Sequence, residues 1–157
     1  MSITLHGTSA SNGIAIGRAH LVSKTEVDII HYTLDAAQIP SEIARYEQAV
    51  RHARKNLEHI RNSIPDNAPA ELGTFLSLHI MMLSDHSLAQ EPRDIIKQQS
   101  CNAEWALKLQ RDELLAQFDE IEESYLRERR ADVIQVVNRI FAALAGEANT
   151  PIPLEAK

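Results

Sequence analysis

The sequence contains seven histidines, the side chain most often used for acid–base catalysis and metal binding near neutral pH. His52 and His59 are seven residues apart in a segment with helical periodicity, so they can share one face. They lack the four-residue spacing and intervening acid of a helical zinc site, and we expect no metal there. His79 lies in an unusually apolar segment. Two interpretations of it stay open: a core histidine with a satisfied nitrogen, or a functional side chain.

The other reactive residue types give no stronger signal. Cys101 lacks the sequence context of an activated nucleophile, so we expect a small buried or boundary residue. Gly13 and Gly17 lack the third glycine and the following helix of a phosphate-binding loop. The acidic residues between Asp112 and Glu123 lack the spacing of a calcium loop and favour a solvated helix end. The sequence therefore predicts no catalytic residue and no metal or cofactor site in this chain.

Composition narrows the class of protein. With 157 residues and 44% hydrophobic residues, the chain can form one domain with a real core. A formal charge of −6 argues against a nucleic-acid-binding protein, which needs a basic surface. The sequence contains no apolar segment of membrane-spanning length, and its single cysteine fits a reducing compartment. We expect a soluble cytoplasmic protein that binds neither nucleic acid nor membrane.

The first thirty residues differ from the rest in pattern. Short β-branched segments at residues 3–5, 14–16, 19–22 and 27–31 predict strands, because glycine and serine separate them. Strands this short do not form a stable sheet alone. Either they pack on the rest of the chain, or they belong to a sheet whose other strands are missing. We expect residues 1–32 to form this unit and residues 147–157 to be a linker or a truncated end.

Residues 33–146 have the periodicity of helices. Ser41, preceded by Pro40, is the predicted N-cap of a first helix that ends before Pro65. Later boundaries are marked by Pro69 before a second helix, an interruption at Asp85–Ser87, Pro92 in the first turn of a further helical run, Asn102 as the cap of a third helix, and a last helix over Ser124–Ala145 followed by Gly146. We predict a mainly α fold with a few short N-terminal strands, in which two helical hairpins form a four-helix bundle.

The segment Leu72–Leu83 is too apolar for a helix that buries only one face. One stripe contains His79 and Met82, while Leu78 and Met81 point elsewhere, on a line that Asp85 and Leu88 continue. Such a helix needs two neighbours, and periodicity alone favours a second neighbour within the same chain. Adjacent methionines also suit a surface that adapts to another protein.

Three segments together resemble the N-terminal region of Enzyme I, the phosphoenolpyruvate–protein phosphotransferase of the bacterial phosphotransferase system. They read Ser-Asn-Gly-Ile-Ala-Ile-Gly-Arg-Ala at residues 11–19, Leu-His-Ile-Met-Met-Leu-Ser-Asp at 78–85 and Tyr-Leu-Arg-Glu-Arg-Arg-Ala-Asp-Val at 125–133. The order and separation of the segments also match, and the resemblance covers the chain up to Gly146.

This resemblance implies that the helices form a bundle, inserted in an α/β phosphohistidine domain, that docks the phosphocarrier protein HPr. It also implies a parent enzyme that uses Mg²⁺ and forms a homodimer through a C-terminal domain. The phosphorylated histidine of the family lies in a later Gly-Gly-Arg-Thr-Ser-His-like motif, and none of the seven histidines has that context. We therefore expect this chain, a truncated part of the enzyme, to bind HPr and to be inactive by itself.

The docking residues carried over by position come from two regions. They are Glu71, His79, Met81, Met82, Asp85 and Leu88 in and after the second helix, and Phe118, Ile121, Leu126 and Arg129 around the connection between the last two helices. For Met82 the resemblance and the periodicity disagree, since the apolar stripe assigns it to the core.

Two other functions remain as alternatives. One is a freestanding helical interaction or regulatory module, which would have little need for the N-terminal strands. The other is a small metalloenzyme using His52 and His59, which would require stoichiometric metal in the purified protein.

Overall fold

A computed structural model describes residues 29–119 and 124–146, and the regular secondary structure in this part of the chain is helical. The helical segments are α1 (Ile39–Asn62), α2 (Ala70–Met82), α3 (His86–Ala89), α4 (Glu91–Gln99), α5 (Ala103–Asp119) and α6 (Ser124–Leu144). The prediction of a mainly helical protein is confirmed.

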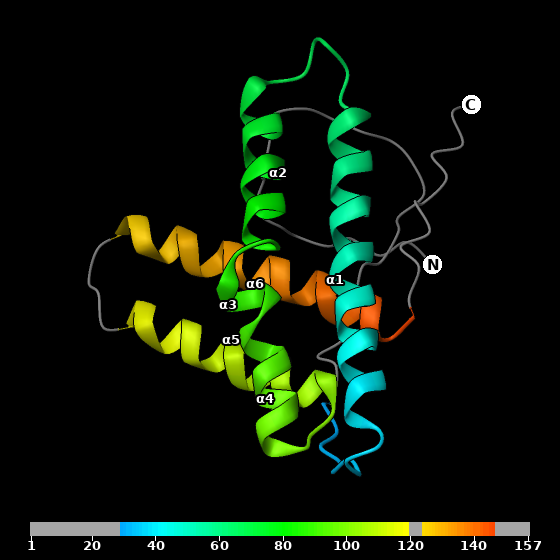
Figure 1. Cartoon of the computed structure of the whole chain (residues 1–157). Coiled ribbons are helices and arrows are strands. Elements are labelled where there is room, and N and C mark those ends of the chain that lie inside the picture. The colour runs from blue at the N-terminus through cyan, green and yellow to red at the C-terminus, as the bar shows by residue number, and fades with distance from the viewer. Residues whose placement is uncertain (1–28, 120–123, 147–157) are drawn as a thin grey trace, which may run out of the picture.

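The long helices form two hairpins that cross each other (Figure 1). Helices α1 and α2 stand side by side, and α5 and α6 form the second pair. Helix α6 crosses α1, packs against it and touches α2. The short α3 and α4 join the hairpins, and α4 packs on α5 and α1. One core therefore lies where the two hairpins meet.

Most of the predicted helix boundaries are confirmed. Helix α2 begins after Pro69, and Pro92 lies in the first turn of α4, where a missing N–H breaks no helical hydrogen bond. Helix α6 spans almost the predicted range, and Gly146 follows it with a φ of 72°, the left-handed conformation that glycine adopts freely. The break at Asp85 is also present, since its carboxylate accepts the Ser87 N–H at the start of α3.

The predicted N-cap of the first helix was wrong. Helix α1 begins at Ile39, and its N-cap is Gln38. Because Pro40 is tolerated in the first turn, the helix can start before it. The Ser41 hydroxyl donates a hydrogen bond of 2.7 Å to the Gln38 carbonyl oxygen and caps no N–H group.

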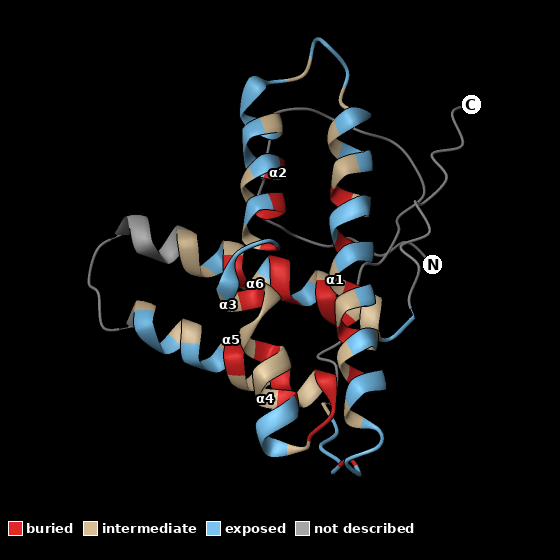
Figure 2. Ribbon diagram, in the orientation of Figure 1, coloured by how far each residue is buried: buried red, intermediate tan, exposed pale blue. Residues whose placement is uncertain are grey.

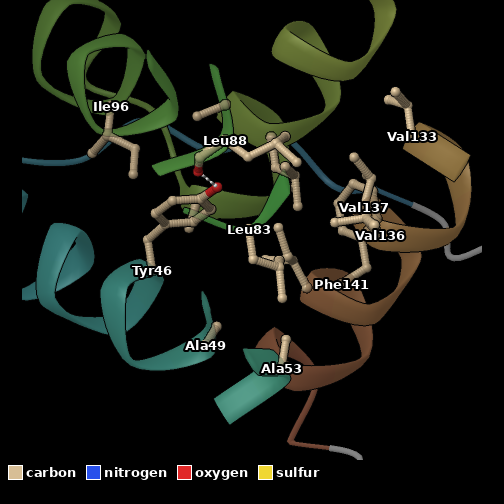
Figure 3. Close-up of a cluster of buried hydrophobic side chains, with 14 of the residues drawn as sticks. Tyr46, Ala49, Ala53, Leu83, Leu88, Ile96, Val133, Val136, Val137 and Phe141 are labelled. Carbon is tan, nitrogen blue, oxygen red and sulfur yellow. Dashed lines mark hydrogen bonds between the residues drawn. The ribbon is translucent and has the colours of Figure 1, made fainter. Parts of the chain in front are cut away.

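The core draws side chains from every helix (Figure 2). Tyr46, Ala49 and Ala53 of α1 face Leu83 and the α6 side chains (Figure 3). Tyr46 is fully buried, and its hydroxyl donates a hydrogen bond of 2.6 Å to the Leu88 carbonyl oxygen. Burial raises the pKa of Tyr46 and keeps this hydroxyl a donor.

The predicted N-terminal strands at residues 3–5, 14–16 and 19–22 lie outside the described residues. Of the strand predicted at 27–31, residues 29–31 are described and are not in a strand. The chain runs instead beside the start of α5, where Thr33 forms an isolated antiparallel bridge with Cys101. Leu34 N–H donates to the Ser100 carbonyl oxygen at 2.7 Å. The domain boundary at residue 32 stays a prediction.

Asn102, the residue before α5, stabilises the pairing of the segment before α1 with the segment before α5. Its carbonyl oxygen accepts the Ala106 N–H, as expected of the predicted cap. Its side-chain amide points elsewhere: Oδ1 accepts the Tyr32 N–H at 3.1 Å, and Nδ2 donates to the Ile30 carbonyl oxygen at 3.0 Å. Asn102 thereby ties the segment before α1 to the start of α5.

Glu42 and Arg45 of α1 complete this junction. Glu42 Oε1 accepts the N–H of Ala103, the first residue of α5, at 2.7 Å. Arg45 donates two hydrogen bonds to each of the Glu42 and Glu104 carboxylates, at 2.7–3.0 Å. These bonds raise the pKa of the Arg45 guanidinium, despite its partial burial. The network joins α1 to α5 across a sequence separation of 59 residues.

Candidate functional site

Helix α2 is apolar on two sides, as its sequence predicts. Leu76, His79 and Ile80 are buried against the rest of the domain. Another face carries Phe75 and Met81, which are 37% and 64% exposed, and the half-buried Leu78 and Met82. We call these last four residues the α2 strip. An apolar surface of this kind on one helix is typical of an interaction site.

Two predicted acidic residues are exposed at the two ends of α2. Glu71 lies in its first turn, and Asp85 lies three residues after its last residue, Met82. Asp85 Oδ1 accepts the Ser87 N–H at 2.9 Å and the Ser87 hydroxyl at 2.6 Å. These hydrogen bonds lower the pKa of Asp85, so the carboxylate is held ionised at the C-terminal end of the α2 strip.

His79 is a core residue. Its side chain is fully buried, its ring lies 4.1 Å from that of Phe75, and its Nε2 lies 3.4 Å from Asp132 Oδ1 of α6. Its Nδ1 is buried without a hydrogen-bond partner in the described structure. Of the two open interpretations, the structure supports the core histidine, although only one ring nitrogen is satisfied. His79 supports the α2 strip from beneath through Phe75.

The sequence pattern predicts Leu88 on the same outward-facing line as Met81, and this prediction was wrong. It is 1% exposed and belongs to the core (Figure 3). The reason is that α2 ends at Met82 and a new helical turn begins at His86. A periodicity extended from Met81 across this break therefore points Leu88 in the wrong direction.

Helix α6 meets α2 beside the α2 strip. Asp132 faces His79 with Oδ1, and its Oδ2 lies 3.9 Å from Nη1 of the predicted docking residue Arg129. Sequence reasoning missed Asp132, although its spacing of three from Arg129 was a signal for an ion pair on a helix.

The remaining predicted site residues either pack at the edge of the core or have side chains that are not described. Phe118 of α5 is half-buried and packs against the core. Met82 does the same, so it lies at the edge of both the core and the α2 strip. Ile121 lies outside the described residues. Leu126 belongs to α6, and its side chain is not described.

The buried His79 predicts a specific pH dependence of stability. Burial lowers its pKa, while Asp132 opposes this shift and Arg139, also on α6, adds to it. A histidine with a lowered pKa stabilises the fold above its unfolded pKa of about 6.5, and this contribution is lost as pH falls below that value. We expect urea unfolding at pH 7.5 and 5.0 to show a larger loss of stability in the unmodified chain than in His79→Gln.

The control for this comparison is His59→Gln, which replaces an exposed histidine on α1. It should leave the difference in stability between the two pH values unchanged. If His79→Gln also leaves that difference unchanged, protonation of His79 is not coupled to folding.

Two further properties limit the chemistry of the described residues. They contain no group of three or more His, Cys, Asp or Glu side chains placed to hold a metal ion. Among them, no helix is both long and apolar enough to cross a membrane.

The described part of the chain is thus a domain of two crossed helical hairpins with an apolar strip on one helix. The sequence matches the family described as PEP-utilising enzyme, N-terminal, over residues 6–129. The chain belongs to this family, and the resemblance to the N-terminal domain of Enzyme I is confirmed.

Relatives by sequence are phosphoenolpyruvate-protein phosphotransferases. That of Cupriavidus necator is 47% identical over 146 residues, which are 93% of this chain and 25% of the relative. That of Listeria monocytogenes is 31% identical with the same coverage. The chain is homologous to a part of these proteins and spans about a quarter of their length.

Solved structures show the same fold. A solution structure of Enzyme I matches with a TM-score of 0.70 at 24% identity, over 77% of this chain and 49% of that one. The N-terminal domain of Enzyme 1 - Nitrogen matches with a TM-score of 0.65 at 23% identity, over 76% of this chain and 50% of that one.

Proposed function

We propose that this chain is the HPr-docking part of an Enzyme I and that it binds HPr through the α2 strip and the adjoining start of α6. The observation that carries this proposal is the exposed apolar surface of α2, centred on Met81. Membership of the PEP-utilising N-terminal family supports HPr as the occupant.

The composition of this surface suits a protein partner. Phe75, Met81 and the half-buried Met82 offer apolar area, and thioethers adapt their shape to the surface they meet. Glu71 and Asp85 flank this area with negative charge, in a chain whose formal charge is −6. A partner with a basic patch around an apolar centre would be steered by these charges and held by the apolar contact.

Docking would serve phosphoryl transfer by proximity. The parent enzyme would take the phosphoryl group from phosphoenolpyruvate, with Mg²⁺, onto an enzyme histidine and pass it to HPr. Holding HPr near that histidine makes the transfer effectively intramolecular. We expect this chain to supply the docking surface and to have no phosphotransferase activity alone.

Truncating the centre of the α2 strip should weaken HPr binding. We expect Met81→Ala to lose about 1–2 kcal/mol of binding free energy, roughly a five- to thirtyfold higher Kd, because interface anchors lose this much on truncation. Its circular dichroism should be unchanged, since the side chain is 64% exposed. Calorimetric titration with HPr from the same organism measures the effect. Met82→Ala should act in the same direction but also reduce stability, because Met82 packs on the core.

The matched control is Ile60→Ala, which removes a 40% exposed hydrophobic side chain from α1. It should bind HPr like the unmodified chain. Equal affinity of Met81→Ala and the unmodified chain would rule out the α2 strip as the docking surface. A complete failure of the unmodified chain to bind HPr would favour the alternative, a helical module for some other partner.

A further inference from the structure

A hollow of about 550 Å³ lies between the middle of α1 and the end of α6. Its polar lining comes from one flank of α1, where Arg45, Gln48, His52 and Lys55 recur at spacings of three and four, with Arg51 beside them. The volume is within the range of small-molecule sites. The hollow shares no lining residue with the α2 strip.

Part of the positive charge at this hollow is left available to a ligand. Arg45 is held by Glu42 and Glu104 and supplies little free charge. The ion pair between Arg51 and Glu47 is long, at 3.7 Å, and 63% of the Arg51 side chain is exposed. Among the described residues, Lys55 and His52 have no carboxylate partner. The hollow is therefore a local basic site in a chain with a formal charge of −6.

The lining is mixed, and this indicates the shape of a ligand. Ala49, Ala143 and Leu144 add apolar surface from α1 and α6 to the basic side chains. Arg45 Nη1 already faces the carbonyl oxygen of Leu144 at 3.4 Å, so the C-terminal end of α6 is partly satisfied by that guanidinium. Arg51, Lys55 and the Gln48 amide are left to face solvent as hydrogen-bond donors.

We propose that this hollow binds a small organic phosphate. A phosphate dianion accepts several hydrogen bonds at once and would be shared by Arg51, Lys55 and Gln48. The organic part would lie against Ala49 and Leu144. This site is separate from the proposed HPr surface, and its occupation does not depend on HPr binding.

The test is an NMR titration of the 157-residue chain with glycerol 3-phosphate and with inorganic phosphate, at constant ionic strength maintained with chloride. We expect saturable shift changes of the backbone amides at residues 48–55 and 143–144. The organic phosphate should bind more tightly than inorganic phosphate, because only it contacts the apolar lining. Equal affinity for both, or no saturable change at these amides, would overturn the proposed ligand class.

Charge reversal separates a site from general attraction. Lys55→Glu should weaken binding at least about tenfold, because it replaces a contact with a repulsion, and the milder Lys55→Gln should weaken it less. Lys97→Glu makes the same charge change at an exposed position on α4 and should leave the affinity unchanged. If Lys97→Glu weakens binding as much as Lys55→Glu, the attraction is nonspecific and the proposal fails. Calorimetry with HPr on the same variants tests the docking surface separately.

Discussion

Replacing Leu88 by alanine is expected to lower the free energy of unfolding by about 2–4 kcal/mol, the usual cost of a leucine-sized cavity in a packed core. Leu88 is 1% exposed and lies between the two hairpins (Figure 3). Its carbonyl oxygen also accepts the buried Tyr46 hydroxyl, so movement of the backbone into the cavity would strain that hydrogen bond. Urea unfolding followed by circular dichroism measures the loss.

The loss of stability in Leu88→Ala should be compared with that in Met81→Ala. Met81 is 64% exposed, so its truncation should change stability by less than about 0.5 kcal/mol. The two substitutions should thus separate the core from the docking surface. A Leu88→Ala variant that keeps its stability but loses HPr binding would place Leu88 in the interface and contradict its assignment to the core.

The second large effect is expected at Asn102. Asn102→Ala should cost about 1–3 kcal/mol, because it leaves the Tyr32 N–H and the Ile30 carbonyl oxygen, whose hydrogen bonds to Asn102 are partly buried, without their partner. The side chain is 1% exposed and satisfies the Tyr32 N–H and the Ile30 carbonyl oxygen, and it also donates to Glu104 at 3.0 Å. Urea unfolding measures the stability. Amide hydrogen exchange should show faster exchange at Tyr32 and Leu34 in this variant.

Asn62→Ala provides the matched control, because it removes an exposed asparagine at the last residue of α1. Its stability should differ from that of the unmodified chain by no more than about 0.5 kcal/mol. An Asn102→Ala variant that loses less than about 1 kcal/mol would mean that water satisfies the same backbone groups equally well.

The helices could be predicted because their signals are local. Pro69, Pro92 and Gly146 each act on the backbone of their own turn, and their positions agree with the structure. The two-sided character of α2 was equally visible, since a helix with Met81 opposite Leu76 must place one of them outside the core. Ser41 failed because serine can donate to a carbonyl oxygen as well as cap an N–H group.

Two kinds of feature could not be predicted: contacts between residues far apart in the sequence, and the orientation of residues after a break between helices. Leu88 was misplaced because the break before α3 resets the helical phase, and no periodicity crosses such a break. The contact of His79 with Asp132 spans 53 residues, and that of Asn102 with Ile30 spans 72. The sequence shows which residues are polar, but the tertiary arrangement of the two hairpins determines which distant residue each of them contacts.

The polar junction around Arg45 and Asn102 has a consequence for how such a domain can be carried by a larger protein. It holds Ile30, where the described chain enters the helices, through Asn102, and Leu144, where it leaves them, through Arg45. Glu104 accepts from both Asn102 and Arg45 and so joins the two connections. The two ends of the helical region are therefore held at one junction. Because its ends are already held together, such a region can be inserted into a surface loop of a host domain at a small cost in loop-closure entropy.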